Sequence, residues 1–468
     1  MTVSPELISQ WMGSARWFGG KGRDWTVTAV APLAELDAPS GPIRLLVARV
    51  EYAGGEVESY QVPLALHEQR VEALDRAYVG EIEEDGRTWY AYDALHDRTA
   101  TALLLKNLRT GATVGDVTFA PLKGADDIPP EVSSRVLSAE QSNTSLVYDD
   151  SAILKVFRKL APGENPDIEI HEALLGVGCE YIAAPLGHIA GRWEHIPGET
   201  VDGSLAMLQE FLATASDGWG LAQSSVRDLF AEADLHADEV GGDFAGESFR
   251  LGAATAAVHA DLARALPTGT FGPERLQPLA SAMKARLEVA VREVPEAAPY
   301  APALTAAYDA LAARTEPVPV QRIHGDYHLG QVMRTPTGWR LLDFEGEPAK
   351  SLAERRAPDS PVRDVAGMLR SFDYAARHQL IDRPRDPQLE YRAEEWAQRN
   401  RSAFCDGYAS VAGADPRADA GLLLAYETDK AVYELLYEAR NRPSWVRIPL
   451  SAIERLSAAA AADAGGAP

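Results

Sequence analysis

The sequence predicts an α+β fold in which a strand-rich N-terminal part precedes a mainly helical C-terminal part. Residues 26–95 contain short runs that alternate apolar and polar side chains between Pro, Gly and Asp, which is typical of half-buried strands. After about residue 211 the apolar residues mostly recur at helical spacing, as in residues 248–266 and 390–411. We therefore expect domains at residues 1–95, 96–210 and 211–468.

Length and charge limit the classes of protein that this chain can represent. Its 468 residues suffice for two or three domains with a large buried core. Asp and Glu number 69 against 45 Lys and Arg, and the resulting net charge of −24 repels phosphate backbones and anionic membranes. We therefore expect neither a nucleic-acid nor a membrane partner.

Location and oligomeric state are predicted from the absence of apolar segments and of other signals. The first 25 residues contain no long apolar run after a basic start, and no stretch of about 18 apolar residues occurs. We therefore expect a cytoplasmic protein. The sequence does not determine the oligomeric state, for which a monomer is the expectation.

Two acidic motifs between residues 321 and 347 predict a site for phosphoryl transfer. Asp326 precedes Gln331 by five positions, and Asp343 follows a short hydrophobic stretch, which is the spacing used by kinase-like phosphotransferases. Asp326 would orient a hydroxyl or accept its proton, while Gln331, Asp343 and Glu345 would supply oxygen ligands for Mg²⁺. Isolated loop carboxylates usually cap helices or anchor turns, but the joint spacing favours phosphoryl transfer.

A lone lysine in an apolar strand predicts a contact with a nucleotide. Lys155 lies in the second strand of a predicted hairpin over residues 145–157, where burial of its ammonium is costly unless an anion meets it. The expected partners are the phosphates of ATP and Glu169, which opens the next helix, with Glu172 as the alternative. A lysine on an edge strand is the other interpretation.

Weaker signals extend the predicted nucleotide site. Ser142 lies in a small polar segment, residues 140–145, at the place of a phosphate-covering loop, although a Gly-rich motif is missing. Glu210 and Leu212 lie in a segment that could join two lobes and present backbone groups to adenine. An ordinary connector would look the same.

Residues around Asp326 are expected to support it. His324 and His328 flank Asp326, and two histidines without a third metal ligand are better explained as hydrogen-bonded groups that orient the loop. Asp364 begins a predicted helix, where it would cap the helix or brace the catalytic loop.

Together these motifs resemble the actinobacterial maltokinase-like family, whose members include glucosamine kinases. The resemblance covers essentially the whole chain and implies a two-lobed, protein-kinase-like fold of the aminoglycoside phosphotransferase type with an added β-rich N-terminal cap domain. It also implies ATP and Mg²⁺, with Asp326 as catalytic base, Gln331 and Asp343 as metal ligands, and Lys155 with Glu169 as the pair that organises the phosphates. The matching segments are residues 16–23, 324–332, 341–348, 360–374, 429–434 and 437–443.

Acidic and aromatic residues near the C-terminus predict a sugar site. Glu427, Glu434 and Glu438 share one broad face of a helix, because spacings of seven and four return to the same side. Carboxylates favour a cationic amine, while aromatic rings stack on a sugar face. A solvated acidic face is the alternative. The expected substrate residues are Asp326, His328, Glu427, Tyr433, Glu434 and Tyr437, with Trp445 as a further stacking ring.

The predicted function is an ATP-dependent sugar kinase. Maltokinases usually carry an apolar residue where Thr428 stands, so glucosamine, phosphorylated at its 6-hydroxyl, is favoured over maltose, phosphorylated at its anomeric hydroxyl. A remote alternative is a non-catalytic kinase-fold binding module, because Gln331 replaces the usual Asn and the Gly-rich loop is missing. A protein kinase is disfavoured, because His-Gly rather than His-Arg precedes Asp326.

Overall fold

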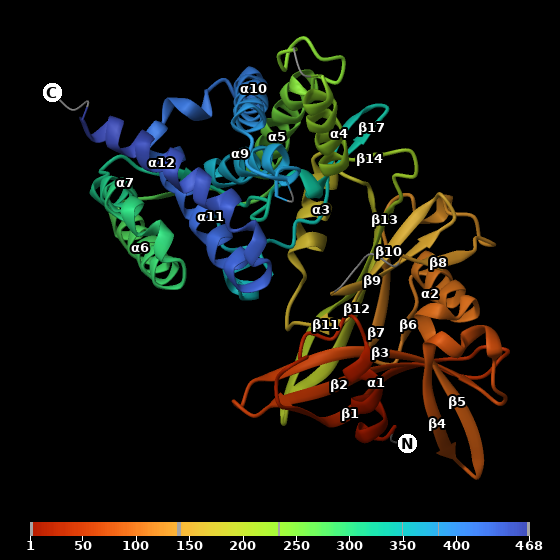
Figure 1. The fold of residues 1–468 in the computed structure, drawn as a ribbon. Coiled ribbons are helices and arrows are strands. Elements are labelled where there is room, and N and C mark those ends of the chain that lie inside the picture. The colour runs from red at the N-terminus through yellow and green to blue at the C-terminus, as the bar shows by residue number, and fades with distance from the viewer. Residues whose placement is uncertain (1–2, 138–141, 233–234, 349, 382, 466–468) are drawn as a thin grey trace. The chain divides into compact units, whose positions relative to one another are not determined.

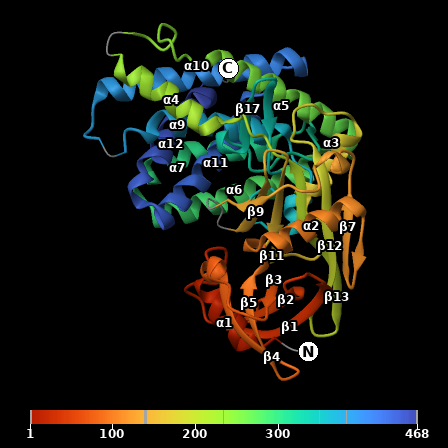
Figure 2. The same cartoon turned by 90° about the vertical axis from the view of Figure 1, so that its right-hand side faces the viewer.

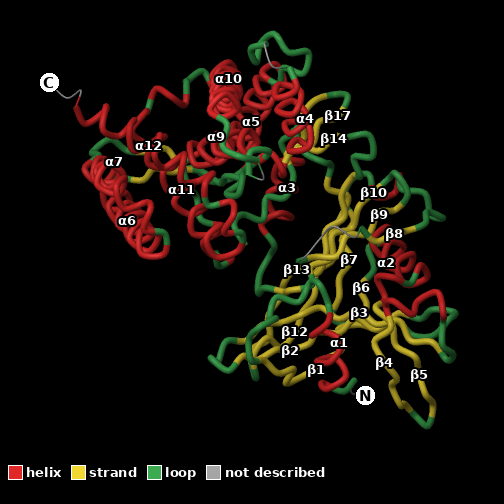
Figure 3. Tube along the Cα trace, in the orientation of Figure 1, coloured by secondary structure: helices red, strands yellow, loops and turns green. Residues whose placement is uncertain are grey.

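The computed structural model describes residues 3–137, 142–232, 235–348, 350–381 and 383–465. The chain forms two compact units. The N-terminal unit comprises Met1–Glu172 and Ala183–Ala213, and the C-terminal unit comprises Ala173–Ile182 and Thr214–Pro468 (Figure 1). Most strands belong to the N-terminal unit and most helices to the C-terminal unit (Figure 3). The three predicted domain ranges stay a prediction.

The N-terminal unit begins with helix α1 (Pro5–Ser14) and an antiparallel sheet. The alternating runs form long strands in the order β1-β2-β3-β5-β4, and the short strand β11 pairs with β3. Leucines, valines and the tyrosines Tyr52 and Tyr60 of these strands pack with Ile8 and Met12 of α1 in one apolar core. The strands are β1 (Trp25–Leu36), β2 (Ile43–Tyr52), β3 (Val57–His67), β4 (Tyr78–Glu84), β5 (Arg87–Asp93) and β11 (Lys159–Leu160).

A second sheet of the N-terminal unit carries the predicted nucleotide hairpin. Strands β9 and β10 turn at Asp149, whose φ of 45° is left-handed, so the predicted hairpin is confirmed. Strand β10 also pairs with β13, which makes Lys155 a residue of an interior strand and excludes the edge-strand interpretation. The sheet has the order β6-β7-β12-β13-β10-β9-β8. Its strands are β6 (Thr113–Val114), β7 (Val117–Pro121), β8 (Ser134–Val136), β9 (Asn143–Tyr148), β10 (Ala152–Phe157), β12 (Pro185–Ile196) and β13 (Glu199–Glu210). Helix α2 (Arg98–Thr110) belongs to the same unit, and helix α3 (Pro166–Gly176) begins in the N-terminal unit and ends in the C-terminal unit.

Helices dominate the C-terminal unit, as the apolar spacing predicts (Figure 2). The helices are α4 (Gly218–Ala231), α5 (Ala245–Ala265), α6 (Pro273–Glu293), α7 (Ala301–Ala313), α8 (Leu352–Arg356), α9 (Pro361–His378), α10 (Pro387–Ala412), α11 (Ala420–Asn441) and α12 (Arg447–Gly465). Two small sheets, β14-β17-β18 and β15-β16, consist of β14 (Ser216–Asp217), β15 (Gly269–Phe271), β16 (Val318–Val320), β17 (Val332–Thr335) and β18 (Gly338–Leu341). The 3-10 helices of the chain are η1 (Glu72–Ala77), η2 (Ala94–His96), η3 (Ala125–Asp127), η4 (Pro295–Tyr300), η5 (Leu329–Gln331), η6 (Pro416–Ala418) and η7 (Pro443–Trp445).

Among the residues that the structure describes, no helix combines the length and the apolar character that a bilayer span requires.

Helices α5 and α10 approach each other closely because each offers a glycine at the contact. A Cβ on Gly252 of α5 would lie 2.0 Å from the carbonyl oxygen of Phe404, and one on Gly407 of α10 would lie 1.9 Å from the carbonyl oxygen of Phe249. Backbone atoms cannot give way as a flexible side chain would, so only glycine fits at these two positions.

We predict that Gly407→Ala lowers the free energy of unfolding by about 1–3 kcal/mol, because the added methyl group forces the two helices apart. Thermal and urea unfolding measure the change. Gly421→Ala in α11 is the matched control, because a Cβ there meets no atom within 4 Å. The control should be neutral or should stabilise by up to about 1 kcal/mol. Equal stability of the two variants would contradict the close contact.

Candidate active site

The loop that carries Asp326 runs from β16 to η5 and is held by helix α9. Asp364 in the first turn of α9 accepts hydrogen bonds from the backbone N–H of His324 (2.8 Å) and of Gly325 (2.9 Å). His259 Nε2 lies 3.0 Å from the same carboxylate. Burial raises the pKa of Asp364, but the His259 contact outweighs this effect, so the pKa lies below its usual value. The predicted role of Asp364 as a brace is confirmed.

Close backbone packing fixes the same loop from a second direction. A Cβ on Gly367 of α9 would lie 2.6 Å from the carbonyl oxygen of Tyr327, so the helix can pass this close only with glycine there. Further on, the N–H of Leu329 donates to Ser371 Oγ (3.0 Å), and Tyr327 OH lies 2.7 Å from Thr255 Oγ1. The loop is therefore fixed on both sides of Asp326.

The side chain of Asp326 meets a cation from helix α11. Lys430 Nζ lies 3.1 Å from Asp326 Oδ1 and 3.5 Å from Glu347 Oε1. Burial raises the pKa of Asp326, but Lys430 lowers it below its usual value. Glu347 also meets Arg363 and Lys350, each at 3.3 Å. Although burial raises the pKa of Glu347, these cations lower it to about 2. Both carboxylates are therefore ionised at neutral pH.

The predicted metal ligands lie on two adjoining segments. Gln331 Nε2 donates to Asp343 Oδ2 over 3.1 Å, and the backbone N–H of Leu342 donates to the carbonyl of Gln331 over 2.9 Å. Asp343 has a left-handed φ of 64°, which turns the chain directly after β18. Glu345 lies 3.9 Å from Arg355. The structure thus brings Gln331 and Asp343 together, as hard oxygen donors of the kind that Mg²⁺ prefers.

A pocket of about 400 Å³ lies beside the loop of Asp326, and His328 of this loop is part of its lining. It joins aromatic rings to two carboxylates and to Lys430, the partner of Asp326. Burial lowers the pKa of His328, so its neutral ring accepts the N–H of Gly330 through Nδ1 (3.1 Å). Such a mixture of flat apolar walls and few polar groups suits a small polar ligand. The lining includes Trp219, His328, Lys430, Tyr433, Glu434, Tyr437, Glu438 and Trp445.

The structure brings two of the three predicted substrate carboxylates to this pocket. Glu434 and Glu438 line the pocket, but Glu427 does not. Both oxygens of Glu427 accept hydrogen bonds from Arg401, at 2.6 and 3.1 Å, and its side chain is only 4% exposed. The spacing of seven residues predicts that Glu427 lies on the same side of the helix as Glu434. Its side chain instead points into the protein interior, where it binds Arg401 of α10.

In the N-terminal unit, Lys155 forms an ion pair with Asp167, which differs from the predicted partner Glu169. Its ammonium lies 3.5 Å from Asp167 Oδ2, in the first turn of α3 and two positions before Glu169. The alternative partner Glu172 meets His188 instead, with 2.8 Å between Oε1 and Nδ1. A phosphate-binding lysine that is oriented by a helix carboxylate is typical of kinases, so Asp167 joins Glu169 as a candidate partner.

The other predicted nucleotide residues lie in the same unit. Ser142 is exposed and directly precedes β9, while residues 140 and 141 of the predicted loop lie outside the described residues. Glu210 ends β13, and its backbone N–H donates to the carbonyl of Ala184 over 2.8 Å. Leu212 follows in the segment after this strand. Their roles toward a nucleotide stay predictions.

Comparison with known proteins agrees with this geometry. Residues 11–97 match the model of the maltokinase N-terminal cap domain, and residues 232–413 match that of the phosphotransferase enzyme family. A glucosamine kinase from Streptacidiphilus jiangxiensis is 29% identical over 371 residues, which cover 75% of this chain and 80% of that protein. A glucosamine kinase from Mycolicibacterium smegmatis is 27% identical over 338 residues, covering 69% of this chain and 79% of that protein.

Solved structures give the same fold. A glucosamine kinase in complex with glucosamine, ADP and inorganic phosphate superimposes with a TM-score of 0.68 at 23% identity, covering 97% of this chain and 100% of the other. Another structure of a glucosamine kinase, crystal form B, superimposes with a TM-score of 0.69 at 23% identity, covering 96% of this chain and 99% of the other. Fold and site thus define a kinase-like phosphotransferase, which confirms the predicted fold and enzyme class. Residues 232–413 of this chain are therefore similar to the phosphotransferase enzyme family, and residues 11–97 are similar to the maltokinase N-terminal cap domain.

We predict that Asp364→Asn lowers the free energy of unfolding by about 1–3 kcal/mol, because an amide can accept only one of the two loop N–H groups and loses the charge that faces His259. Urea unfolding measures the loss. Asp386→Asn is the control, since Asp386 caps α10 at an exposed end and asparagine caps equally well. Two variants of equal stability would show that Asp364 does not hold the loop.

Proposed function

We propose that the protein is an ATP-dependent glucosamine kinase that transfers the γ-phosphate of ATP to the 6-hydroxyl of the sugar. The observation that carries the proposal is an ionised, oriented Asp326 beside a pocket that combines aromatic walls with the carboxylates of Glu434 and Glu438. A glucosaminium ion needs both features, because its ring faces stack on aromatic side chains and its amine pairs with a carboxylate. The curated relatives named above support the same substrate.

In this proposal Asp326 acts mainly by orientation. Its lowered pKa makes it a weak base, but phosphoryl transfer needs little proton abstraction before the transition state. The carboxylate accepts the hydrogen bond of the sugar hydroxyl and aims its oxygen, while Lys430 keeps the carboxylate charged and in place. His328, whose Nδ1 accepts the N–H of Gly330, lines the pocket and can donate a hydrogen bond from Nε2 to the sugar.

ATP and Mg²⁺ complete the proposed site. Gln331 and Asp343, with Glu345 as a further donor, would hold Mg²⁺, because their carboxylate and amide oxygens are of the type this ion prefers. The ion supplies positive charge against the phosphates during transfer. In the N-terminal unit Lys155 would bind the phosphates, with Asp167 and Glu169 orienting its ammonium group. Ser142, Glu210 and Leu212 mark the surrounding nucleotide region. A cytoplasmic location and a monomeric state belong to the same proposal.

Maltose is the second candidate substrate, because the N-terminal region matches the maltokinase cap model. The volume of the pocket does not discriminate between a monosaccharide and a disaccharide. Steady-state kinetics with MgATP and glucosamine, glucose or maltose separates the candidates, with the phosphorylated position read by NMR. We expect the highest kcat/KM for glucosamine and a product phosphorylated at position 6. A higher value for maltose would replace the proposal by the second candidate, and no turnover with any sugar would favour a binding module.

We predict that Asp326→Asn lowers kcat by about 10²–10⁴-fold, because the amide cannot accept the hydroxyl proton and orients the sugar oxygen poorly. The affinity for ATP, measured by isothermal titration calorimetry, should change little. Asp309→Asn is the matched control, because Asp309 forms an exposed ion pair with Lys284. Asp359→Asn is less suitable as a control, because Asp359 forms an ion pair with Arg363. Near-normal turnover of Asp326→Asn would remove Asp326 from its proposed role.

We predict that Lys430→Met moves the acidic limb of the kcat/KM profile to higher pH by about one unit or more. Burial and Glu347 raise the pKa of Asp326, while Lys430 lowers it. Without Lys430 the pKa of Asp326 rises, so the inactive protonated form accumulates at a higher pH. Lys350→Met is the control, because Lys350 meets Glu347 and makes no ion pair with Asp326. An unmoved acidic limb in Lys430→Met would contradict this coupling.

A further inference from the structure

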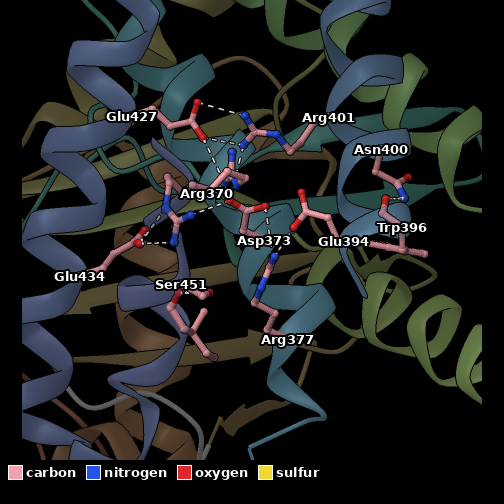
Figure 4. A network of polar contacts seen from close by, with 12 residues as sticks. Arg370, Asp373, Arg377, Glu394, Trp396, Asn400, Arg401, Glu427, Glu434 and Ser451 are labelled. Atoms are coloured by element: carbon pink, nitrogen blue, oxygen red, sulfur yellow. Dashed lines mark hydrogen bonds and ion pairs between the residues drawn. The ribbon is translucent and has the colours of Figure 1, made fainter. Parts of the chain in front are cut away.

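A buried network of arginines and carboxylates lies behind the proposed sugar pocket, among helices α9, α10, α11 and α12 (Figure 4). The side chains of Arg370 and Asp373 are 0% and 1% exposed. Burying charges costs free energy even when they are paired, and apolar side chains of similar size often give equal stability. A network of this kind therefore invites a role besides stability. Its members are Arg370, Asp373, Arg377, Glu394, Arg401, Glu427, Glu434 and Arg455.

Asp373 is the centre of this network. It accepts a hydrogen bond from Arg370 Nη1 over 2.5 Å and another from Arg455, and it lies 3.6 Å from guanidinium nitrogens of both Arg377 and Arg401. Burial raises the pKa of Asp373, but the four guanidinium groups outweigh it, so the carboxylate is ionised. Because Asp373 lies one helical turn from Arg370 on α9, it fixes the direction of the Arg370 guanidinium.

Arg370 in turn binds one of the two carboxylate oxygens of Glu434. Its Nε and Nη2 donate to the same carboxylate oxygen, Glu434 Oε2, over 3.0 and 2.8 Å. Oε1 takes part in neither bond, and Glu434 lines the pocket. Figure 4 shows Glu434 reaching from α11 to the guanidinium of Arg370, with the rest of the network on the far side of that group. The pair thus leaves one carboxylate oxygen for a ligand.

We infer that Arg370, fixed by Asp373, is a positioning residue that orients Glu434 and thereby sets the preference of the pocket for an amino sugar over the neutral sugar of the same shape. This inference rests on the proposed function, because it names the interaction that would select the amine. The guanidinium does not contact the sugar. It acts through Glu434, whose free oxygen would receive the ammonium group of the substrate.

The charge of Glu434 also depends on this contact. Burial raises the pKa of Glu434, while Arg370 and Lys430 oppose that rise and Asp373 adds to it. The pocket further contains His328, His378, Tyr374, Tyr433 and Glu438 as titratable neighbours. Removal of Arg370 would leave a buried carboxylate with one cation fewer, so that the neutral acid would form more readily and attract an ammonium group less.

An arginine suits this task better than a lysine. Its planar guanidinium directs separate N–H groups to Asp373 and to Glu434 at the same time, whereas an ammonium is a point charge on a flexible stem. We therefore expect Arg370→Lys to keep the charge but to lose part of the orientation.

The test compares charge removal at two arginines of one network. Arg370→Met and Arg370→Gln remove the cation that holds Glu434, and Glu434→Gln is the reference for full loss of its charge. Arg401→Met is the matched control, because Arg401 is also buried against Asp373 but binds Glu427, which does not line the pocket. Thermal unfolding and ATP affinity establish that each variant is folded. The readout is kcat/KM for glucosamine divided by kcat/KM for glucose.

We expect the Arg370 variants to lower this ratio by about tenfold or more, mainly through a higher KM for glucosamine. The ratio for Arg370→Lys should lie between that of the wild type and that of the other Arg370 variants. Arg401→Met should be less stable than the wild type but should keep the wild-type ratio. An unchanged ratio in folded Arg370→Met or Arg370→Gln, or an equal loss in Arg401→Met, would overturn the inference.

Failure of the proposed function has a different signature, because the wild-type enzyme itself would then prefer glucose or maltose. In that case the KM for the preferred sugar is compared in the same variants. A KM that is unaffected by Arg370→Met would overturn the positioning role for that sugar as well.

Discussion

The contact between helix α9 and the loop of Asp326 is the constraint on which the candidate site depends. Asp364 accepts two backbone N–H groups of this loop, and Gly367 lets the carbonyl of Tyr327 come close to the helix. One and two turns further along, Arg370 and Tyr374 reach Glu434 and Glu438 of α11. The loop and one wall of the pocket are therefore positioned by the same rigid element, which keeps their separation fixed when other parts of the chain move.

This arrangement concentrates buried charge on one helix. Asp364, Arg370 and Asp373 are all at most 2% exposed, and each has at least one hydrogen-bond partner of complementary charge on another element. Removal of one partner from such a set leaves an uncompensated charge, which is far more costly than the net contribution of the pair. The helix therefore tolerates little substitution on its inner face, and this intolerance follows from electrostatics more than from the volume of the side chains.

Much of the fold could be predicted from the sequence, because the type of each element follows from residues that are close together in the chain. Alternation gave the strands of the N-terminal unit, the turn at Asp149 gave the β9–β10 hairpin, and helical spacing gave α5 and α10. The spacing between Asp326 and Gln331 likewise identified the loop that the structure places beside Asp343. These signals need only neighbours in the chain, so they can be interpreted without knowing the tertiary contacts.

The parts that could not be predicted depend on pairs that are distant in sequence. Lys430 lies 104 positions from Asp326, and no local pattern marks it as its partner, although it precedes Glu434 by one helical turn on α11. The ion pair of Lys155 with Asp167 could not be predicted, because the order of residues in the chain fits Glu169 equally well and does not show that Asp167 also reaches the lysine. Glu427 was misplaced because helical spacing shows which residues share a face but not which arginine faces them.

The position of Lys430 also explains why a carboxylate with a lowered pKa can serve in this site. A base of high pKa would be protonated part of the time beside Glu347, and it would then present a hydroxyl group instead of an acceptor to the sugar. Lys430 disfavours this protonated form, because its ammonium lowers the pKa of both Asp326 and Glu347. Since Lys430 and Glu434 stand one turn apart on α11, the cation that fixes Asp326 and the carboxylate proposed to receive the amine move as one body. In the proposed function, the residue that receives the amine and the residue that orients Asp326 therefore belong to the same helical turn.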